Sequence, residues 1–403
     1  MKPSGEYSPD CLVFEVRTEE PNSAAEKRGR PMNFYRRVGS ATTGRLFGIA
    51  KNLLAIPNWA ASVSATVRAS TAFSPCLRAV PFTPIFGQRT ALEISARSGD
   101  CSSKISESNV PKSPGKKLRE AASAGTLQVP GAFNALAARL IERSGFSATY
   151  LSGAAFSAGV FALPDIGLFT LTELVSHTRC ITAAVDIPLI VDADTGFGEA
   201  LNLERTVREL ENAGAGAIQL EDQIMPKRCG HLSGKTLVSC EEMCAKIRAA
   251  ASVRQDRDLV ILARTDARGV HDMDDAVSRA RAYVEAGADW IFPEALQSLD
   301  EFASFSESVD APLVANMTEF GKSPLLHFHD LSEMKYAAVL YPVTLLRLAM
   351  KQAQHGLEVI KATGSQESLL DAMQSRQELY DLLDYSGFEE RDRAHFQASQ
   401  TSD

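Results

Sequence analysis

The sequence predicts an α/β protein whose main domain is a (β/α)8 TIM barrel, with an extra helix beyond the barrel at the C-terminus. From about Leu127 onward, eight short apolar runs alternate with helical patterns, which indicates parallel strands joined by helices. The runs are apolar almost throughout, as strands covered on both faces must be. Polar residues follow most of them, at the end of the strands where barrel enzymes build their active sites.

The predicted strands are Leu127–Pro130, Ala148–Ser152, Leu189–Asp192, Ala217–Leu220, Leu259–Ala263, Trp290–Pro293, Leu313–Asn316 and Ala337–Leu340. Between them, residues 201–213, 240–250 and 272–286 carry apolar side chains at helical spacing. Gly214 and Gly287 lie at or just past helix ends, where glycine is favoured. A final amphipathic helix is predicted over residues 366–383. Barrel closure does not require this helix, so we expect it to dock on a neighbouring subunit.

The 403 residues have the composition of a globular protein, with 45% hydrophobic and 23% charged residues. A formal net charge of −8 argues against general nucleic-acid binding. No run of 18 apolar residues occurs, so no membrane-spanning helix is expected. The seven cysteines are odd in number and form no dense framework, which favours a reducing compartment over a disulfide scaffold.

Residues 1–115 form a basic N-terminal extension with 15 Lys and Arg against 9 Asp and Glu, whereas the remainder holds 27 against 41. No acidic residue occurs from Lys27 to Leu92, among many Arg, Ser, Thr and Ala. This composition is typical of an organelle transit peptide and predicts import into the mitochondrial matrix, with Met32 as the working start. A disordered cytosolic tail is the alternative. The polar stretch 101–117 predicts a linker, so the barrel domain is placed at 116–403.

Two aspartates follow the third predicted strand in the run Val191-Asp-Ala-Asp-Thr-Gly. Asp192 and Asp194 stand two residues apart, so their side chains should point the same way. Glu221 and Asp222 end the next strand. Carboxylates converging on the barrel mouth suit Mg²⁺ or Mn²⁺, which take oxygen ligands. The alternative is that the aspartates accept hydrogen bonds from the glycine-rich loop after Asp194.

The run Lys227-Arg228-Cys229-Gly230-His231 follows the fourth predicted strand and should lie on a loop. Two cations beside a thiol should lower the pKa of Cys229 and attract anions. Gly230 permits close approach of the backbone to a substrate. Such a loop can bind a carboxylate and bring a sulfur proton to a reacting carbon.

Three further arginines, Arg264, Arg347 and Arg376, are candidates for substrate binding. Arginine grips a carboxylate through two parallel hydrogen bonds. Together with Lys227 they suggest a substrate with more than one carboxylate. Arg376, on the predicted last helix, has a surface position as its alternative.

The Lys-Arg-Cys-Gly-His run resembles the signature of isocitrate and methylisocitrate lyases. The resemblance extends from about Leu127 to Arg391 through Tyr150-Leu-Ser-Gly, Leu163-Pro-Asp-Ile-Gly, Val191-Asp-Ala-Asp-Thr-Gly-Phe-Gly, Glu221-Asp-Gln, Ala263-Arg-Thr-Asp, Phe292-Pro-Glu-Ala and Asn316-Met-Thr-Glu-Phe-Gly. One departure is Ser152-Gly153-Ala154-Ala155, where many relatives have Ser-Gly-Gly-Gly. The compact body, Phe292-Pro-Glu and Leu340-Tyr-Pro are similar to methylisocitrate enzymes, because isocitrate lyases carry side chains there that crowd the extra methyl.

The resemblance implies retro-aldol cleavage of the tricarboxylate 2-methylisocitrate to pyruvate and succinate, in propionate breakdown through the methylcitrate cycle. It implies Mg²⁺, with Mn²⁺ as an alternative, held through Asp192 and Asp194. Cys229 would donate the proton that completes succinate. The base that takes the hydroxyl proton would be Tyr150 or a metal-linked carboxylate. The resemblance also implies a homotetramer with an exchanged C-terminal helix, and no nucleic-acid or membrane partner.

The remaining residues share the task of holding the substrate. By resemblance, the cations and the histidine of the catalytic loop are Lys227, Arg228 and His231, and the substrate contacts are Ser152, Gly153, Ala154, Asp165, Cys229, Gly230, Arg264, Glu294, Asn316, Thr318, Arg347 and Arg376. The rival readings are an isocitrate lyase, another enzyme of the same superfamily such as a phosphonopyruvate mutase or oxaloacetate hydrolase, and a barrel that has lost catalysis.

Overall fold

The computed structural model describes residues 14–18, 63–67, 112–232 and 234–400. The chain divides into two compact units, residues 1–109 and 110–403. In the first unit, β1 (Phe14–Thr18) pairs antiparallel with β2 (Val63–Val67). The predicted transit peptide, including Met32, otherwise lies outside the described residues.

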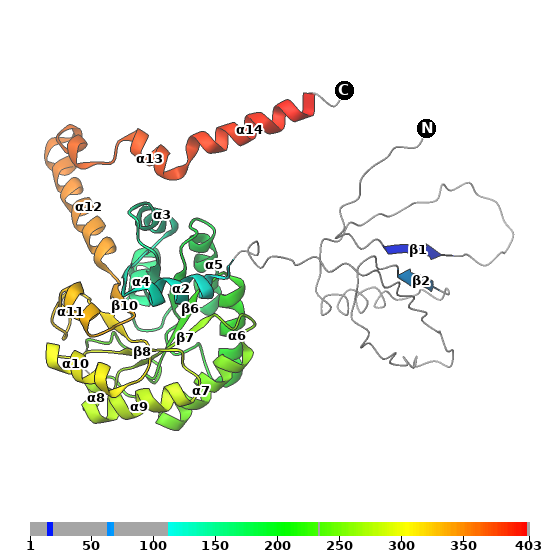
Figure 1. Cartoon of the computed structure of the whole chain (residues 1–403). Helices are drawn as coiled ribbons and strands as arrows, with labels where there is room; N and C mark the ends of the chain where they lie inside the picture. The colour runs from blue at the N-terminus through cyan, green and yellow to red at the C-terminus, as the bar shows by residue number, and fades with distance from the viewer. Residues whose placement is uncertain (1–13, 19–62, 68–111, 233, 401–403) are drawn as a thin grey trace. The chain divides into compact units, whose positions relative to one another are not determined.

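The second unit is built on eight parallel strands that confirm all eight predicted strands (Figure 1). They are β3 (Leu127–Pro130), β4 (Thr149–Leu151), β5 (Leu189–Asp192), β6 (Ala217–Glu221), β7 (Val260–Thr265), β8 (Trp290–Pro293), β9 (Val314–Asn316) and β10 (Ala338–Tyr341). Hydrogen bonds join them in the orders β4-β5-β6-β7-β8 and β3-β10-β9. Parallel bridges Gly131–Tyr150 and Ile291–Leu313 connect the two groups, so the barrel closes as the sequence predicts.

Helix α2 (Pro114–Ala124) places Leu118 against the residues that fill the barrel, and Leu118 is fully buried there with Val129, Ile190 and Val260. The prediction of a linker over residues 101–117 therefore ends too late. The side chain of Ser113 accepts a hydrogen bond from the N–H of Lys116, and Pro114 occupies the first turn. Proline suits that position because its missing N–H has no partner in a helix anyway.

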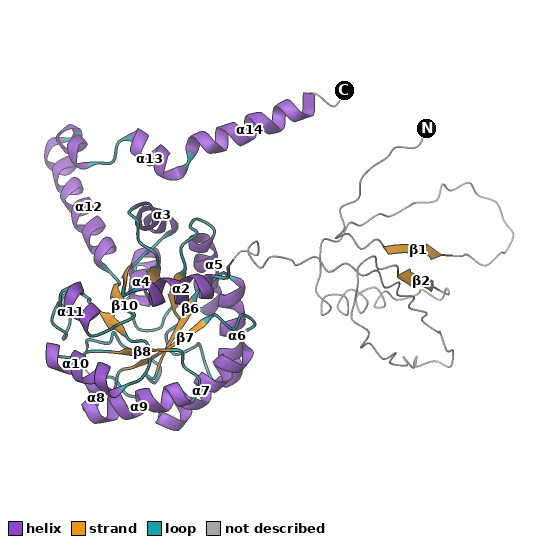
Figure 2. Cartoon of the chain, viewed as in Figure 1, coloured by secondary structure: helices purple, strands orange, loops and turns teal. Residues whose placement is uncertain are grey.

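Helices surround the barrel (Figure 2). They are α3 (Ala135–Arg143), α4 (Gly153–Phe161), α5 (Leu171–Thr182), α6 (Ala200–Asn212), α7 (Cys240–Val253), α8 (Ala267–Val270), α9 (Met273–Glu285), α10 (Leu299–Ser308) and α11 (Phe328–Glu333). The predicted helices over 201–213, 240–250 and 272–286 are confirmed as α6, α7 and α9. Their apolar stripes, such as Leu203, Val207 and Leu210 of α6, are buried against the outer face of the strands.

The chain after the barrel continues as α12 (Thr344–Thr363), the 3₁₀ helix η2 (Glu367–Ala372), α13 (Arg376–Leu383) and α14 (Tyr385–Gln400). The prediction of one helix over 366–383 is wrong, because the chain breaks between η2 and α13. Ser375 and Glu378 form a capping box that starts α13 anew. Arg139 of α3 donates a hydrogen bond of 3.2 Å to the carbonyl of Leu382, which ties α13 to the barrel unit.

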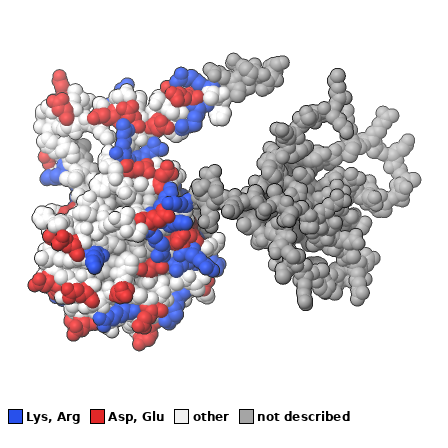
Figure 3. All heavy atoms as spheres, in the orientation of Figure 1, with Lys and Arg blue, Asp and Glu red and all other residues white. Residues whose placement is uncertain are grey.

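Mixed charges cover the face of the barrel unit drawn in Figure 3, without a large region of one sign. Among the helices that the structure describes, none has the length and hydropathy needed to span a bilayer.

Candidate active site

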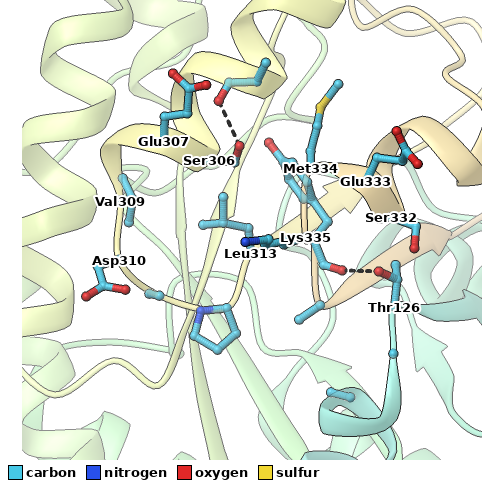
Figure 4. Close-up of a pocket in the computed structure, with 17 residues that line it drawn as sticks. Thr126, Ser306, Glu307, Val309, Asp310, Leu313, Ser332, Glu333, Met334 and Lys335 are labelled. Carbon is cyan, nitrogen blue, oxygen red and sulfur yellow. Dashed lines mark hydrogen bonds between the residues drawn. The ribbon is translucent and has the colours of Figure 1, made fainter.

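Two cavities of the barrel unit can be compared by their positions relative to the strands. The larger, of about 940 Å³, is lined by Thr126, Leu313 and Lys335, which precede strands β3, β9 and β10 (Figure 4). The smaller, of about 440 Å³, lies at the opposite ends of the strands. Since (β/α)8 enzymes build their active sites at the C-terminal ends, the smaller cavity is the candidate active site.

Most of the predicted site residues line this smaller cavity. They are Tyr150, Ser152, Ala154, Asp165, Asp192, Lys227, Arg228, Cys229, Gly230, His231, Arg264, Glu294, Asn316, Thr318 and Arg347. Gly153 and Asp194 lie directly behind the lining, in contact with Asp192. Arg376 does not line it; its position is exposed on the first turn of α13. Within one chain, therefore, the structure brings together every predicted site residue except Arg376.

Asp192 is held at the end of β5 by three donors. Its Oδ2 accepts from the N–H of Gly153 at 3.0 Å, and its Oδ1 accepts from Gln219 Nε2 at 2.9 Å and from the N–H of Asp194 at 3.2 Å. A Cβ at Gly153 would lie 3.0 Å from Asp194 Oδ1 and 3.2 Å from Asp192 Oδ2, so a side chain there would press on both carboxylates. Gly153, at the start of α4, thus lets the helix N-terminus approach them closely.

Gln219 is a site residue that the sequence analysis missed. Its Nε2 donates to Asp192, and its Oε1 accepts a hydrogen bond of 2.8 Å from the hydroxyl of Tyr150. Burial and the nearby Asp192 charge raise the pKa of Tyr150 well above its usual range, so its ionised form is disfavoured. The only available signal was a polar residue within an otherwise apolar strand run.

Asp194 departs from the strand with a left-handed φ of +48°, which turns its carboxylate toward Lys227. The Lys227 ammonium lies 2.7 Å from Asp194 Oδ1, outside hydrogen-bond geometry, and also pairs with Asp165. Burial would lower the pKa of Lys227, but Asp194, Glu221 and Asp165 raise it well above its usual range. Lys227 is therefore a buried permanent cation between carboxylates.

The carboxylates behind the cavity have spare acceptor capacity. In the part of the chain that the structure describes, both oxygens of Asp194 and both oxygens of Glu221 are buried without a hydrogen-bond partner. Burial raises the pKa of Asp194 to about 7 although the Lys227 charge opposes the shift. The nearest cations are the Lys227 ammonium, 2.7 Å from Asp194 Oδ1, and Nη1 of Arg264, 3.3 Å from Glu221 Oε2. Hard oxygen donors of this kind also fit Mg²⁺.

Asp222 does not face the cavity, contrary to the expectation that it would join the carboxylates at the barrel mouth. Its Oδ2 accepts from the hydroxyls of Thr265 at 2.8 Å and Tyr283 at 2.7 Å, and its Oδ1 accepts from the N–H of Asp266 at 3.0 Å. Neighbouring residues on a strand point to opposite faces, so Glu221 turns inward and Asp222 outward.

The loop between β6 and α7 carries Cys229 at the cavity. Gln223 anchors it, because its amide donates to the carbonyl of Arg228 and accepts from the N–H of Arg228, both at 2.9 Å. Gly230 packs on the barrel residues: a Cβ there would meet Arg264 Nη2 at 2.4 Å and Glu294 Cγ at 2.6 Å. The glycine is therefore required by close packing against the protein itself.

The prediction that Lys227 and Arg228 lower the pKa of Cys229 is wrong in sign. Burial raises the pKa of Cys229, and the nearby Asp165 and Glu294 charges add to this, against a hydrogen bond from the N–H of His231 and the Arg264 charge. The positive charge of Lys227 is balanced by the carboxylates of Asp165 and Asp194, and Arg228 is exposed to solvent. The thiol is thus protonated at neutral pH, the form that a proton donor requires.

Alkylation of Cys229 by iodoacetamide should therefore be slow at neutral pH even without a ligand. Only the thiolate reacts, so a raised pKa moves its appearance to higher pH. The rate should rise about tenfold per pH unit through and beyond pH 8.5, the usual thiol pKa. Mass spectrometry of the Cys229 peptide measures this rate, with the exposed Cys180 as internal reference. A Cys229 rate that levels off below pH 8 would contradict the raised pKa.

His231, Glu294 and Asn316 form a second polar group across the cavity. Nδ1 of His231 accepts from the N–H of Lys322 at 2.9 Å, so the proton sits on Nε2 and points at Glu294 Oε1 at 2.9 Å. Burial would raise the pKa of Glu294, but Arg264 and His231 hold it well below its usual range. Asn316 donates to Glu294 at 3.2 Å, and its buried Oδ1 has no partner among the described residues. That oxygen can accept a hydrogen bond from a ligand.

Arg264 faces the cavity with most of its donors already engaged. Its Nε and Nη2 donate to the two oxygens of Asp266 at 2.9 and 3.1 Å, and its Nη1 lies 3.3 Å from Glu221 and 3.5 Å from Glu294. The bidentate grip expected for a substrate carboxylate is thus made with Asp266. Asp266 stands in the Ala-Arg-Thr-Asp run and, like Gln219, is a site residue that the sequence analysis did not predict.

The rim of the cavity is formed by the start of α12 and the loop after β9. Arg347 of α12 lies with its Nε 3.4 Å from Glu319 and its guanidinium 5.4 Å from the centre of the Phe320 ring. Thr318, in the same loop, lines the cavity. Ser152 begins α4 as its N-cap, so its hydroxyl accepts from the N–H of Ala155 at 3.4 Å.

The barrel unit is similar in sequence to known proteins over most of its length. Residues 116–361 match the family model described as phosphoenolpyruvate phosphomutase. The chain is 55% identical over 280 residues to a 2-methylisocitrate lyase of Aeropyrum pernix, covering 69% of this chain and 90% of that protein. It is 44% identical over 281 residues to a 2-methylisocitrate lyase of Escherichia coli, covering 69% and 95%.

Solved structures of the same fold place the chain more broadly. A 2,3-dimethylmalate lyase, 32% identical, superposes with a TM-score of 0.66 and covers 72% of this chain and 96% of that one. A phosphonopyruvate hydrolase crystallised with oxalate and Mg²⁺, 34% identical, gives a TM-score of 0.63 and covers 70% and 98%. The chain belongs to the 2-methylisocitrate lyases of the phosphoenolpyruvate mutase/isocitrate lyase superfamily.

Proposed function

We propose that this chain is a carbon–carbon lyase that cleaves 2-methylisocitrate to pyruvate and succinate. The observation that carries the proposal is that the Cys229 thiol and the fixed carboxylate Asp192 line the same cavity, where burial raises the pKa of the thiol and favours its protonated form. A proton donor and a carboxylate group for the hydroxy-acid end are the two functions that a retro-aldol cleavage needs. Curated relatives that are 44 to 55% identical carry the same activity in their names.

Mg²⁺ is the metal that we propose for this site, with Asp192 and Asp194 holding it and Glu221 close behind. The orphaned oxygens of Asp194 and Glu221 and the all-oxygen donor set support this choice. When bound, Mg²⁺ would polarise the substrate hydroxyl and stabilise negative charge developing on its oxygen.

In the proposed reaction the hydroxyl proton passes to a protein base as the bond between the hydroxyl-bearing carbon and its neighbour breaks. The O–H electrons form the keto group of pyruvate, and the broken bond leaves its electron pair on the carbon that becomes succinate. The Cys229 thiol then protonates that carbon. We assign the base to the carboxylate group of Asp192 and Asp194, because the hydroxyl of Tyr150 donates to Gln219 and resists ionisation.

The surrounding residues hold the substrate carboxylates in this proposal. Asn316, Thr318 and Arg347 would bind the part of the substrate that becomes succinate. The exposed Arg228 would bind a carboxylate from the loop that carries Cys229. His231 donates to Glu294, so this pair orients the polar wall of the cavity. Arg376 is kept as a substrate contact only if it comes from another subunit, since its own chain holds it outside the cavity.

The methyl group of the substrate should make the enzyme selective. Phe292, Leu340 and Pro342 line the cavity and offer apolar contact to a methyl. One methyl in an apolar pocket changes kcat/KM by about 10- to 200-fold. We therefore expect pyruvate release from 2-methylisocitrate to exceed glyoxylate release from isocitrate by that factor, measured with Mg²⁺ present. Equal rates, or a preference for isocitrate, would favour the isocitrate lyase alternative.

We also propose that the chain forms a homotetramer that exchanges its C-terminal helices. Leu357 of α12 and Phe388 of α14 are 68% and 59% exposed within one chain, and Leu370 between them is 61% exposed. Exposed apolar side chains in such number are typical of an interface. Light scattering should give four chains for the wild type and fewer for Leu357→Glu, whereas an unchanged mass would oppose the proposal.

The N-terminal extension supports a location in the mitochondrial matrix, because residues 1–115 carry the excess of basic residues. N-terminal sequencing of the mature protein from fractionated cells tests this. A terminus before Met32 would rule out Met32 as the start, and recovery of the full extension in the cytosol would rule out import.

A further inference from the structure

A buried ion pair fastens the loop that carries Cys229 to the barrel. Lys235, near the end of this loop, places its ammonium 2.6 Å from Asp266 Oδ1, with side chains that are 1% and 0% exposed. The same ammonium donates to the carbonyl oxygen of Gly230. Gly230 adjoins Cys229 in the chain, so the contact acts one residue from the thiol.

Asp266 connects this contact to the rest of the site. Directly after β7, it receives Arg264 through two hydrogen bonds, and its N–H donates to Asp222 at 3.0 Å. Gly230 packs against the Arg264 guanidinium so closely that a Cβ would lie 2.4 Å from Nη2. Asp266 therefore holds Gly230 in two ways. It binds Lys235, which donates to the Gly230 carbonyl, and it binds Arg264, against which Gly230 packs.

A buried ammonium and a buried carboxylate each lose their hydration, and replacing such a pair by apolar groups is often neutral or stabilising. Stability alone is thus a weak reason for this pair. The groups that contact the two residues are the Gly230 carbonyl, the Arg264 guanidinium and the Asp222 carboxylate, and they lie on the loop or at the C-terminal ends of the strands.

We infer that Lys235 and Asp266 are positioning residues, which hold the Gly230 carbonyl and thereby aim the Cys229 thiol at the carbanion carbon. The inference rests on the proposed lyase reaction for its kinetic consequence. Its structural consequence is independent of the reaction: when the ion pair is broken, the loop should shield the Cys229 thiol less from solvent.

The variant Lys235→Met keeps the length of the side chain and removes both contacts. A displacement of about 1 Å costs about 100-fold in rate, so we expect kcat for 2-methylisocitrate to fall about 100-fold with KM changed little. In D₂O the wild type should place one deuterium on one face of succinate. Lys235→Met should give both faces, because solvent then protonates the carbanion. Asp266→Asn should change the same quantities in the same direction.

The matched control is Lys246→Met. Lys246 is also a buried lysine with an acidic partner, 3.7 Å from Glu242, but it lies on α7 and does not line the cavity. It should keep the wild-type kcat and a single deuterated product. Circular dichroism and thermal unfolding establish whether each variant is folded.

A second measurement does not depend on lyase activity. Iodoacetamide at fixed pH should label Cys229 several-fold faster in Lys235→Met and Asp266→Asn than in the wild type, and at the wild-type rate in Lys246→Met. A wild type inactive on 2-methylisocitrate would refute the proposed function while this labelling still tests the loop contact. Folded Lys235→Met and Asp266→Asn with wild-type labelling, kcat and stereochemistry would overturn the inference.

Discussion

Replacing Cys229 with serine should lower kcat for 2-methylisocitrate by about 10³-fold and leave KM within a small factor of the wild type. A positioned proton donor contributes about 10² to 10⁴ in rate. A serine hydroxyl occupies the same place but is a far weaker acid than a thiol, so it cannot protonate the carbanion at the same rate. The raised pKa of Cys229 means that the thiol is already protonated before substrate binds.

The measurement is initial-rate release of pyruvate and succinate at saturating Mg²⁺. Cys244→Ser is the matched control, because Cys244 is a buried thiol on α7 that donates to the carbonyl of Ala282 at 3.5 Å, outside the cavity. That variant should retain the wild-type kcat. Activity of Cys229→Ser close to the wild type would remove Cys229 from the mechanism and leave solvent as the proton source.

The barrel could be predicted because the residues of each strand and helix carry the pattern that determines it. Strands covered on both faces must be apolar throughout, and all eight were located from that pattern alone. The errors fall where local signals conflict. Pro114 looked like a linker residue but opens α2, and the 366–383 pattern concealed a new start at Ser375. In both places the capping side chain, Ser113 or Ser375, decided where the helix begins.

The site was predictable to the extent that it sits on strand ends. Asp192, Glu294 and Asn316 could be placed from the strand pattern, because the C-terminal ends of barrel strands converge. The pKa of Cys229 could not, since neighbours in sequence need not be neighbours in space. The Lys227 ammonium pairs with Asp165 and Asp194, although Lys227 stands two residues from Cys229 in the sequence. Lys235 and Gln219 were missed because only the folded chain shows which atoms they bind.

Two substitutions at the carboxylate group should separate metal binding from folding, with Asp194→Asn as the decisive one. Neither oxygen of Asp194 accepts a hydrogen bond within the described residues, so an amide leaves no donor unpaired there, and the ion pair that it removes leaves Lys227 paired with Asp165. The change removes one negative charge from the proposed Mg²⁺ site. A metal supplies several kcal/mol of transition-state stabilisation, so kcat/KM should fall by about 10³-fold. Isothermal titration with Mg²⁺ should show no saturable binding at millimolar concentration.

Asp192→Asn should lose the same activity but also lose stability, because Asp192 accepts from three donors and an amide group would oppose at least one of them. An unpaired buried donor costs about 1–3 kcal/mol. The metal-free Asp194→Asn protein should instead gain stability relative to the wild type as the pH rises. Ionisation of Asp194 costs the wild type stability from its ordinary pKa of 3.8 up to its folded pKa of about 7, and the difference should stay constant at higher pH.

Thermal unfolding of both variants in EDTA, at pH 6 and pH 8, measures this difference. Asp300→Asn, an exposed aspartate in the first turn of α10, is the control for loss of one negative charge and should keep activity and Mg²⁺ binding. If Asp194→Asn bound Mg²⁺ as the wild type does, the Asp194 carboxylate would be paired with Lys227 and would not bind the metal. The metal would then have to be sought on Asp192 and Glu221.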